Sequence, residues 1–110
     1  MTKIILHGCN GRMGQVICGL IAEDENVEVV AGVDISNHIS NPFPVFSTIS
    51  ECDVDADVII DFSHPSVLED LLNFAKSKKI PAVIATTGLN EQQIENIKTV
   101  SDIVKFIEEN

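Results

Sequence analysis

Short runs of apolar residues alternate along the chain with longer stretches in which apolar residues recur every three or four positions. The first pattern is typical of buried strands and the second of amphipathic helices. The runs at 4–7, 27–33, 57–62 and 80–85 predict four strands, and Val45–Phe46 predicts at most a short fifth one. Strands that are apolar throughout are expected where helices cover both faces of a sheet.

Three stretches carry the helical pattern, at 13–21, 67–75 and 94–107. Pro65 suits the first turn of the second helix, and Asn90 is a good N-terminal cap for the third. The last stripe predicts one helix, or two with a break near 101–102. The alternation of strands and helices predicts one α/β domain over residues 1–110: a Rossmann-like, doubly wound parallel sheet of about five strands with helices on both faces.

Three glycines at strict three-residue spacing, Gly8, Gly11 and Gly14, follow the first strand in the stretch "GCNGRMG". Between a strand and a helix, glycine allows a sharp turn, close approach of a pyrophosphate to the backbone, and tight packing of the helix. The start of the helix offers unpaired N–H groups and a positive dipole end to phosphates. The spacing is a variant of the commoner G-x-G-x-x-G, so a glycine-rich turn that serves packing alone remains the alternative.

Polar residues follow the other strands. Asp34 ends the second strand about 20 residues after the glycines, where a carboxylate accepts hydrogen bonds from an adenosine ribose; a solvated loop residue is the alternative. The later strand ends carry "DFSHPS" (61–66) and "ATTG" (85–88). Ligands bind outside the carboxyl ends of parallel strands. We therefore expect the hydroxyls of Ser63, Thr86 and Thr87 beside the middle and the nicotinamide end of a cofactor, or else in turns and caps.

With these three motifs in this order and spacing, residues 1–98 resemble the N-terminal dinucleotide-binding domain of dihydrodipicolinate reductase, also called 4-hydroxy-tetrahydrodipicolinate reductase. This family consists of NAD(P)H-dependent oxidoreductases of the diaminopimelate route to lysine. The resemblance implies that the glycine loop holds the pyrophosphate, that Asp34 holds the adenosine ribose, and that Thr87 lies at the edge of the substrate site. Ala85 stands where the family has glycine. The implied cofactor-binding residues are Gly8, Asn10, Gly11, Arg12, Met13, Gly14, Asp34, Phe62, Ser63, Ala85, Thr86 and Gly88.

The resemblance also bears on cofactor choice. It implies that Arg12 can meet the 2′-phosphate of NADPH, whereas an exposed arginine at a helix start is the alternative. Asp34 favours a free 2′-hydroxyl, and Ile35 supplies no second cation. NADH is therefore the favoured cofactor, with NADPH tolerated.

The family continues into a substrate domain with a His-His-x-x-Lys stretch, which supplies the proton donor and the contacts to a cyclic imine dicarboxylate. This sequence contains no such stretch. We therefore predict no catalytic residue in the chain, which alone should bind cofactor without turnover. The family's homotetramer is built largely by the substrate domain and is expected to be lost. Residues 99–110 are interpreted as a helical tail, left by deletion, truncation or divergence.

The histidines and cysteines show no metal-ligand spacing, so no metal site is predicted. His7 is interpreted as structural, and His64 as a loop or capping residue near the cofactor cleft. Cys9 lies at a helix start, where a thiolate is stabilised. Redox sensing and a small residue fitted into a tight loop are both open.

Charge and composition limit the partners. Seventeen acidic against seven basic residues give a net charge of −10, which disfavours nucleic acid and anionic membranes. No apolar run is long enough to cross a bilayer. The odd number of cysteines, without a CxxC pair, favours a reducing compartment, so a cytoplasmic protein is expected.

A second hypothesis is a stand-alone nucleotide-binding module, such as a redox sensor or a coenzyme A-binding domain, without a catalytic role. Asp34 favours a dinucleotide ribose over coenzyme A, which carries a 3′-phosphate there.

Overall fold

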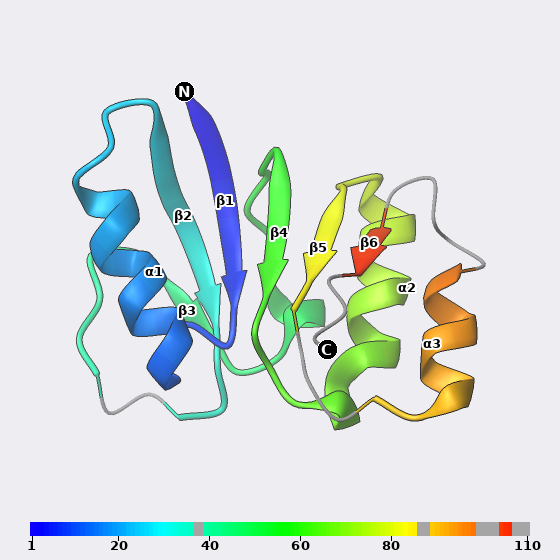
Figure 1. Ribbon diagram of the computed structural model, residues 1–110. Coiled ribbons are helices and arrows are strands. Elements are labelled where there is room, and N and C mark those ends of the chain that lie inside the picture. The colour runs from blue at the N-terminus through cyan, green and yellow to red at the C-terminus, as the bar shows by residue number, and fades with distance from the viewer. Residues whose placement is uncertain (37–38, 86–88, 99–103, 107–110) are drawn as a thin grey trace.

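Six parallel strands form one sheet in the computed structural model, which describes residues 1–36, 39–85, 89–98 and 104–106. The strands are β1 (Thr2–His7), β2 (Val27–Val33), β3 (Val45–Phe46), β4 (Val58–Asp61), β5 (Ala82–Ile84) and β6 (Val104–Phe106). Their order across the sheet is β3-β2-β1-β4-β5-β6, and every neighbouring pair is parallel (Figure 1). The direction of strand order reverses between β1 and β4, which is the switch point at which α/β sheets bind ligands.

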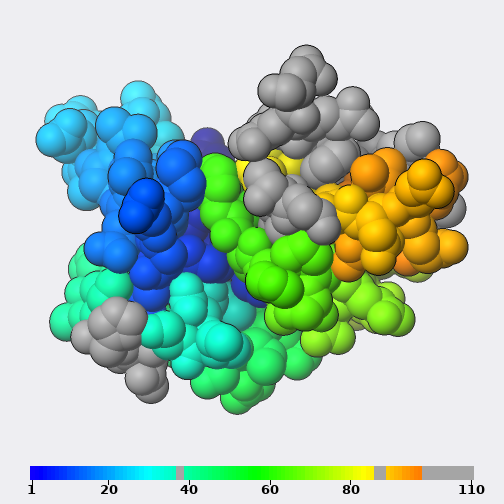
Figure 2. Space-filling view, turned by 60° about the horizontal axis from the view of Figure 1, so that its bottom comes forward, coloured from blue at the N-terminus to red at the C-terminus, as the bar shows by residue number. Residues whose placement is uncertain are grey.

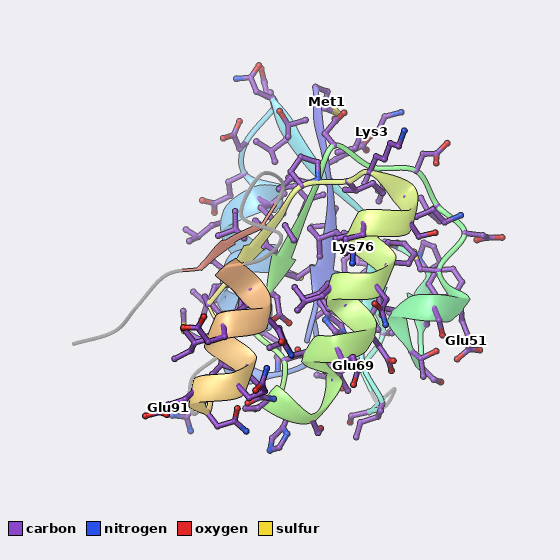
Figure 3. The ribbon with its side chains drawn as sticks, turned by 90° about the vertical axis from the view of Figure 1, so that its right-hand side faces the viewer. Met1, Lys3, Glu51, Glu69, Lys76 and Glu91 are labelled. Carbon is purple, nitrogen blue, oxygen red and sulfur yellow. The ribbon has the colours of Figure 1, made fainter. Side chains whose placement is uncertain are left out.

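The helices lie on both faces of the sheet, as the sequence predicts. They are α1 (Arg12–Ala22), α2 (Leu68–Lys78) and α3 (Glu91–Lys98), with short 3₁₀ turns η1 (Ile49–Glu51) and η2 (Pro65–Val67). Figures 1 and 3 together show α1 on one face of the sheet and α2 with η1 on the other, and α3 packs beside α2, with Ile97 in the same core cluster. Pro65 opens η2, which runs directly into α2. The doubly wound Rossmann-like fold is thus confirmed, with one strand more than expected.

The core explains why the strands are apolar throughout. Ile5 on β1, Ile59 on β4 and Ile84 on β5 are fully buried. From α2, Leu71 and Ala75 are fully buried against them in the same core cluster. Each large aliphatic side chain buried in this way contributes roughly 1.5–3 kcal/mol. The central strands and α2 therefore form a rigid base for the loops at the carboxyl ends of the strands.

Helix α1 does not bury its apolar face as α2 does, although the helical spacing of its apolar residues was predicted correctly. Gly14 is its only buried residue, whereas Met13, Val16 and Leu20 are 49%, 51% and 61% exposed. A Cβ at position 14 would come within 2.2 Å of the Gly8 carbonyl oxygen. Close contact through a glycine, rather than burial of the whole apolar stripe, thus sets how α1 lies on the loop below it.

The predicted helical tail is wrong for Val104–Phe106, which form β6 and pair with Ala82–Ile84 at the edge of the sheet. Periodicity alone cannot distinguish a short apolar helical segment from a strand. Here the segment forms a strand because it can pair with the edge of β5. Residues 99–103 and 107–110 lie outside the described residues.

Helix α3 begins with the predicted cap: the Gln93 N–H donates to Asn90 Oδ1 at 2.8 Å, and the Asn90 N–H donates to Gln93 Oε1 at 3.0 Å.

None of the helices in the described part of the chain has both the length and the apolar character needed to cross a membrane.

Candidate functional site

A pocket of about 390 Å³ opens at the switch point, beside the carboxyl ends of β1, β2 and β4. Figure 2 brings this edge of the sheet forward and shows the first helix, the segment after β2 and the segment after β4 grouped around it. Five of the predicted site residues line the pocket: Gly8, Gly11, Asp34, Phe62 and Ser63. Residues from three separate loops thus meet where the strand order reverses.

Gly8 is required by the fold itself. Its φ of +90° lies in a region that favours glycine, and a Cβ there would come within 2.9 Å of the carbonyl carbon and oxygen of Phe62. Its N–H donates to the Val33 carbonyl at 2.7 Å. The turn after β1 is therefore locked against the ends of both neighbouring strands.

Gly11 is different, because no contact with the described residues requires a glycine there. Among those residues, a Cβ at this position would meet only the Gly8 carbonyl oxygen, at an ordinary contact distance of 3.4 Å. Gly11 lines the pocket and caps α1, without any side-chain cap for the helix. The N–H groups of Arg12, Met13 and Gly14 have no hydrogen-bond partner among the described residues, as the first turn of a helix leaves them. This open helix start can receive an anion such as a phosphate.

Asp34 holds the glycine loop. Its Oδ2 accepts a hydrogen bond from the Asn10 N–H at 3.0 Å, and its Oδ1 accepts one from the Ser36 N–H at 2.9 Å. The Asn10 side chain is buried; it donates to the Ser36 carbonyl, and its oxygen accepts from Asn41 Nδ2 at 2.8 Å. Asn10 therefore positions the loop through protein contacts, and its contact with a cofactor stays a prediction.

At the end of β4, Asp61 organises the other wall of the pocket. Both the N–H and the hydroxyl of Ser63 donate to Asp61 Oδ1, and His7 Nδ1 lies 3.1 Å from the same oxygen. Asp61 and His7 are only 1% and 4% exposed. His64 accepts a hydrogen bond from the Ser66 N–H at Nδ1, at 3.1 Å, and so caps η2. This confirms the interpretation of His64 as a capping residue, and His64 also lines the pocket.

The remaining predicted residues fall outside the pocket wall. Arg12 and Met13 are exposed at the start of α1, and Ala85 follows β5, where its N–H donates to the Asp61 carbonyl at 2.9 Å. Gly14 is buried beneath the loop. Thr86, Thr87 and Gly88 lie outside the described residues.

Sequence reasoning missed Ser47, Thr48 and Ile49, which line the pocket from the far side of Asp34. They follow β3, a strand of only two residues. The rule that ligands meet the carboxyl ends of strands would have pointed to them. Val67 and Asp70, from η2 and α2, were also missed.

Cys9 is buried inside the loop rather than offered at its surface. Burial, and secondarily the charge of Asp34, raise the pKa of the Cys9 thiol to about 11. The thiol therefore stays protonated at neutral pH, which favours the packing role over a reactive thiolate. No group of three or more potential metal ligands is found among the described residues.

The sequence profile of the family described as "Dihydrodipicolinate reductase, N-terminus" matches residues 2–110. This chain belongs to that family. The match extends to residue 110, so the expectation that the likeness stops at residue 98 is wrong, and β6 lies within the matched region.

Curated relatives point to the same dihydrodipicolinate reductase family. The 4-hydroxy-tetrahydrodipicolinate reductase of Clostridium novyi (strain NT) is 43% identical over 104 residues, which cover 94% of this chain and 41% of the relative. That of Caldanaerobacter subterraneus subsp. tengcongensis is 46% identical over 101 residues, or 92% of this chain and 40% of the relative. The chain thus spans about two fifths of the length of these relatives.

Solved structures agree on the fold. A dipicolinate-bound dihydrodipicolinate reductase from Paenisporosarcina sp. TG-14 superposes with a TM-score of 0.73 at 24% identity, over 86% of this chain and 41% of that one. A scyllo-inositol dehydrogenase from Lactobacillus casei, solved with NAD(H) and scyllo-inositol, superposes with a TM-score of 0.74 at 18% identity, over 97% of this chain and 35% of that one. At these identities the likeness concerns the fold alone.

Proposed function

We propose that this chain is the cofactor-binding part of a 4-hydroxy-tetrahydrodipicolinate reductase, and that it binds NADH in preference to NADPH in the switch-point pocket. The observation that carries the proposal is Gly11. It lies at the pocket beside N–H groups without a partner in the described part of the chain, and no contact in that part requires a glycine at this position. A glycine in that position leaves room for a diphosphate to approach the backbone.

The residues present fit a dinucleotide from end to end. The N–H groups of the first turn of α1 would hold the diphosphate, with Gly11 giving access. Each Asp34 oxygen accepts one hydrogen bond from a backbone N–H. A carboxylate oxygen can accept more than one hydrogen bond, so ribose hydroxyls can also donate to Asp34. Phe62 and Ser63 would flank the nicotinamide half. Ala85, Thr86 and Gly88 complete that side, and Thr87 meets the substrate; these four roles rest on the family motif.

Preference for NADH follows from the charges around the pocket. Asp34 and Asp70 line it, and no lysine or arginine is among its described lining residues. A 2′-phosphate on the adenosine ribose would be repelled by Asp34, whereas a free hydroxyl can donate to it. Arg12, exposed at the start of α1, is the cation that would allow NADPH to be tolerated.

In the complete reductase, the bound nicotinamide supplies the hydride that reduces the cyclic imine dicarboxylate to tetrahydrodipicolinate. The residues of this chain bind and orient the cofactor for that step. Binding and turnover are separable, because two substrate carboxylates need cationic partners that this pocket does not offer. A cytoplasmic location and the loss of the family's tetramer remain predictions.

The test is a titration of the chain with NADH, NADPH and coenzyme A, each followed by calorimetry. NADH should saturate at lower concentration than NADPH, and coenzyme A should bind more weakly than both. Tightest binding of coenzyme A would favour the stand-alone module instead. No saturation by millimolar NADH, in a folded sample, would contradict the proposal.

A matched pair of variants locates the binding. Gly11→Val puts a branched side chain into the diphosphate approach and should abolish NADH binding. Gly19→Val makes the same change on the same helix, where a Cβ meets no atom within 4 Å, and should bind NADH normally. Equal affinities in the two variants would show that the diphosphate does not lie at Gly11.

A further inference from the structure

His7 lies at the end of β1, immediately before the glycine loop, and its ring is buried beside the pocket that it lines. Its hydrogen-bond contacts are all made by Nδ1, which lies 3.1 Å from Asp61 Oδ1 and 3.4 Å from Ser63 Oγ. Nε2 has no partner in the described part of the chain. No buried side-chain nitrogen or oxygen there lacks a partner, so Nε2 is not sealed in the core. It reaches the pocket.

Because Asp61 contacts Nδ1 of His7, Nε2 is the ring nitrogen that is available to a ligand. The N–H and hydroxyl of Ser63 hold Asp61 Oδ1 in place. This carboxylate oxygen lies 3.1 Å from His7 Nδ1, and because a carboxylate only accepts hydrogen bonds, Nδ1 must carry a hydrogen. Nε2 then has two states. It is an acceptor in the neutral ring and a donor in the imidazolium ion.

The charges around the pocket favour the donor state once an anion binds. The lining residues that can ionise are His7, Asp34, His64 and Asp70. The segment 86–88, which follows β5, contains only threonine and glycine and adds no ionisable side chain. His64 is exposed and its Nδ1 caps η2. His7 is therefore the buried group in the pocket wall that can gain a positive charge opposite a diphosphate.

We propose that His7 contacts the bound dinucleotide, with Nε2 donating a hydrogen bond to a diphosphate oxygen, and that binding is accompanied by proton uptake at His7. The diphosphate is the assigned partner because His7 is joined directly to Gly8, and Gly8 and Gly11 line the same pocket. A ribose hydroxyl would instead donate to neutral Nε2 and require no proton. This proposal rests on the proposed function and adds to it a residue and a proton.

Proton uptake at His7 fixes the direction in which NADH affinity changes with pH, and this direction can be measured. Because the imidazolium form binds the diphosphate and the neutral form does not donate to it, NADH affinity should rise as the pH falls. Adenosine, which has no phosphate, should show neither the pH dependence nor the proton uptake.

The experiment is calorimetric titration of the chain with NADH near neutral pH, in two buffers of different ionisation enthalpy. The difference in apparent binding enthalpy gives the number of protons taken up. It should approach about one per NADH where His7 is neutral in the free chain, and should fall toward zero at lower pH, where His7 already carries the proton before NADH binds. His7→Asn keeps a donor toward Asp61 but cannot titrate. It should bind NADH roughly tenfold more weakly and take up no proton. His64→Asn, which keeps a good helix cap, should still take up the proton.

The outcomes separate this proposal from the proposed function. If folded wild-type chain binds no NADH, the proposed function fails and this proposal fails with it. If NADH binds without proton uptake, or if the uptake disappears in His64→Asn and persists in His7→Asn, this proposal alone is overturned. The wild-type measurement decides even where His7→Asn does not fold.

Discussion

The Asp34 carboxylate accepts a hydrogen bond from the Asn10 N–H at 3.0 Å, and so the acidic residue that ends β2 also holds the glycine loop that follows β1. The same carboxylate is the group proposed to bind the adenosine ribose. Loop position and ribose binding are therefore coupled through one side chain. A change at Asp34 should affect both, in proportions that depend on the residue introduced.

Asp34→Ser should weaken NADH binding and raise NADPH affinity relative to it, by an amount on the order of 1–3 kcal/mol in the ratio of the two affinities. Asp34→Asn loses the charge but keeps an oxygen that can accept the Asn10 N–H. It should shift the ratio in the same direction with a smaller loss of thermal stability. Titration of both variants with both cofactors checks this, and an unchanged affinity ratio in both would remove Asp34 from the ribose site.

Gly8 and Gly19 should respond in opposite ways to the same substitution. Gly8→Ala introduces a Cβ within 2.9 Å of the Phe62 backbone at a φ of +90°, and should lower the free energy of unfolding by about 2 kcal/mol or more. Gly19→Ala fills open space in an exposed helix and should raise it by about 1 kcal/mol. Urea denaturation measures both. A Gly8→Ala protein as stable as wild type would contradict the close approach of these two loops.

Cys9 should make the fold sensitive to alkali. Its thiol pKa is raised from 9.0 to about 11 in the folded chain, so the unfolded chain loses this proton first as the pH rises. The contribution of the buried thiol to the free energy of unfolding is fully present below about pH 9. Between about pH 9 and 11 this contribution, roughly 2–3 kcal/mol, is lost. Cys9→Ala should show a shallower fall in stability over that window. Equal slopes for wild type and variant would contradict the burial of the thiol.

The chain alone should bind NADH without reducing dihydrodipicolinate. The basic residues of α2 include Lys76 and Lys78 in its last turn, and Figure 3 shows Lys76 farther from the carboxyl-end edge of the sheet than Glu69. Holding a substrate against the nicotinamide accounts for roughly 7–11 kcal/mol of a barrier in well-oriented cases. The described residues that line the pocket include no lysine or arginine that could hold two carboxylates. NADH oxidation followed at 340 nm, beside a full-length reductase, tests this. Turnover near that of the control would mean that a catalytic site lies within these residues.

The sequence predicted the parts of the fold that depend on local pattern. Apolar runs located β1, β2, β4 and β5, and the three-residue glycine spacing located the loop that lines the pocket. Pairing at a sheet edge is not local, which is why the stripe ending at Ile107 was assigned to a helix although Val104–Phe106 pair with β5.

The lining of the pocket was predicted to a similar degree. Motifs pointed to Gly11, Asp34 and Ser63, which line the pocket, because each follows a strand at a recognisable spacing. Their contacts with a cofactor stay predictions. Ser47 and Thr48 were missed because the expected strand at Val45–Phe46 was too short to be counted among the strands whose carboxyl ends would meet a ligand. The position of His7 on Asp61 depends on the register of β1 with β4, which pairs His7 with Asp61. No single segment of sequence contains that information.

The most direct test of the central claim is an amide ¹H–¹⁵N NMR titration of the uniformly labelled chain with NADH. The account predicts saturable shifts of the Gly8, Gly11, Asp34 and Ser63 amides, which surround the pocket. The amides of Asn26 and Lys79, near the amino ends of β2 and β5, should stay in place. Shifts centred on Asn26 and Lys79, or none at saturating NADH, would contradict dinucleotide binding at this pocket.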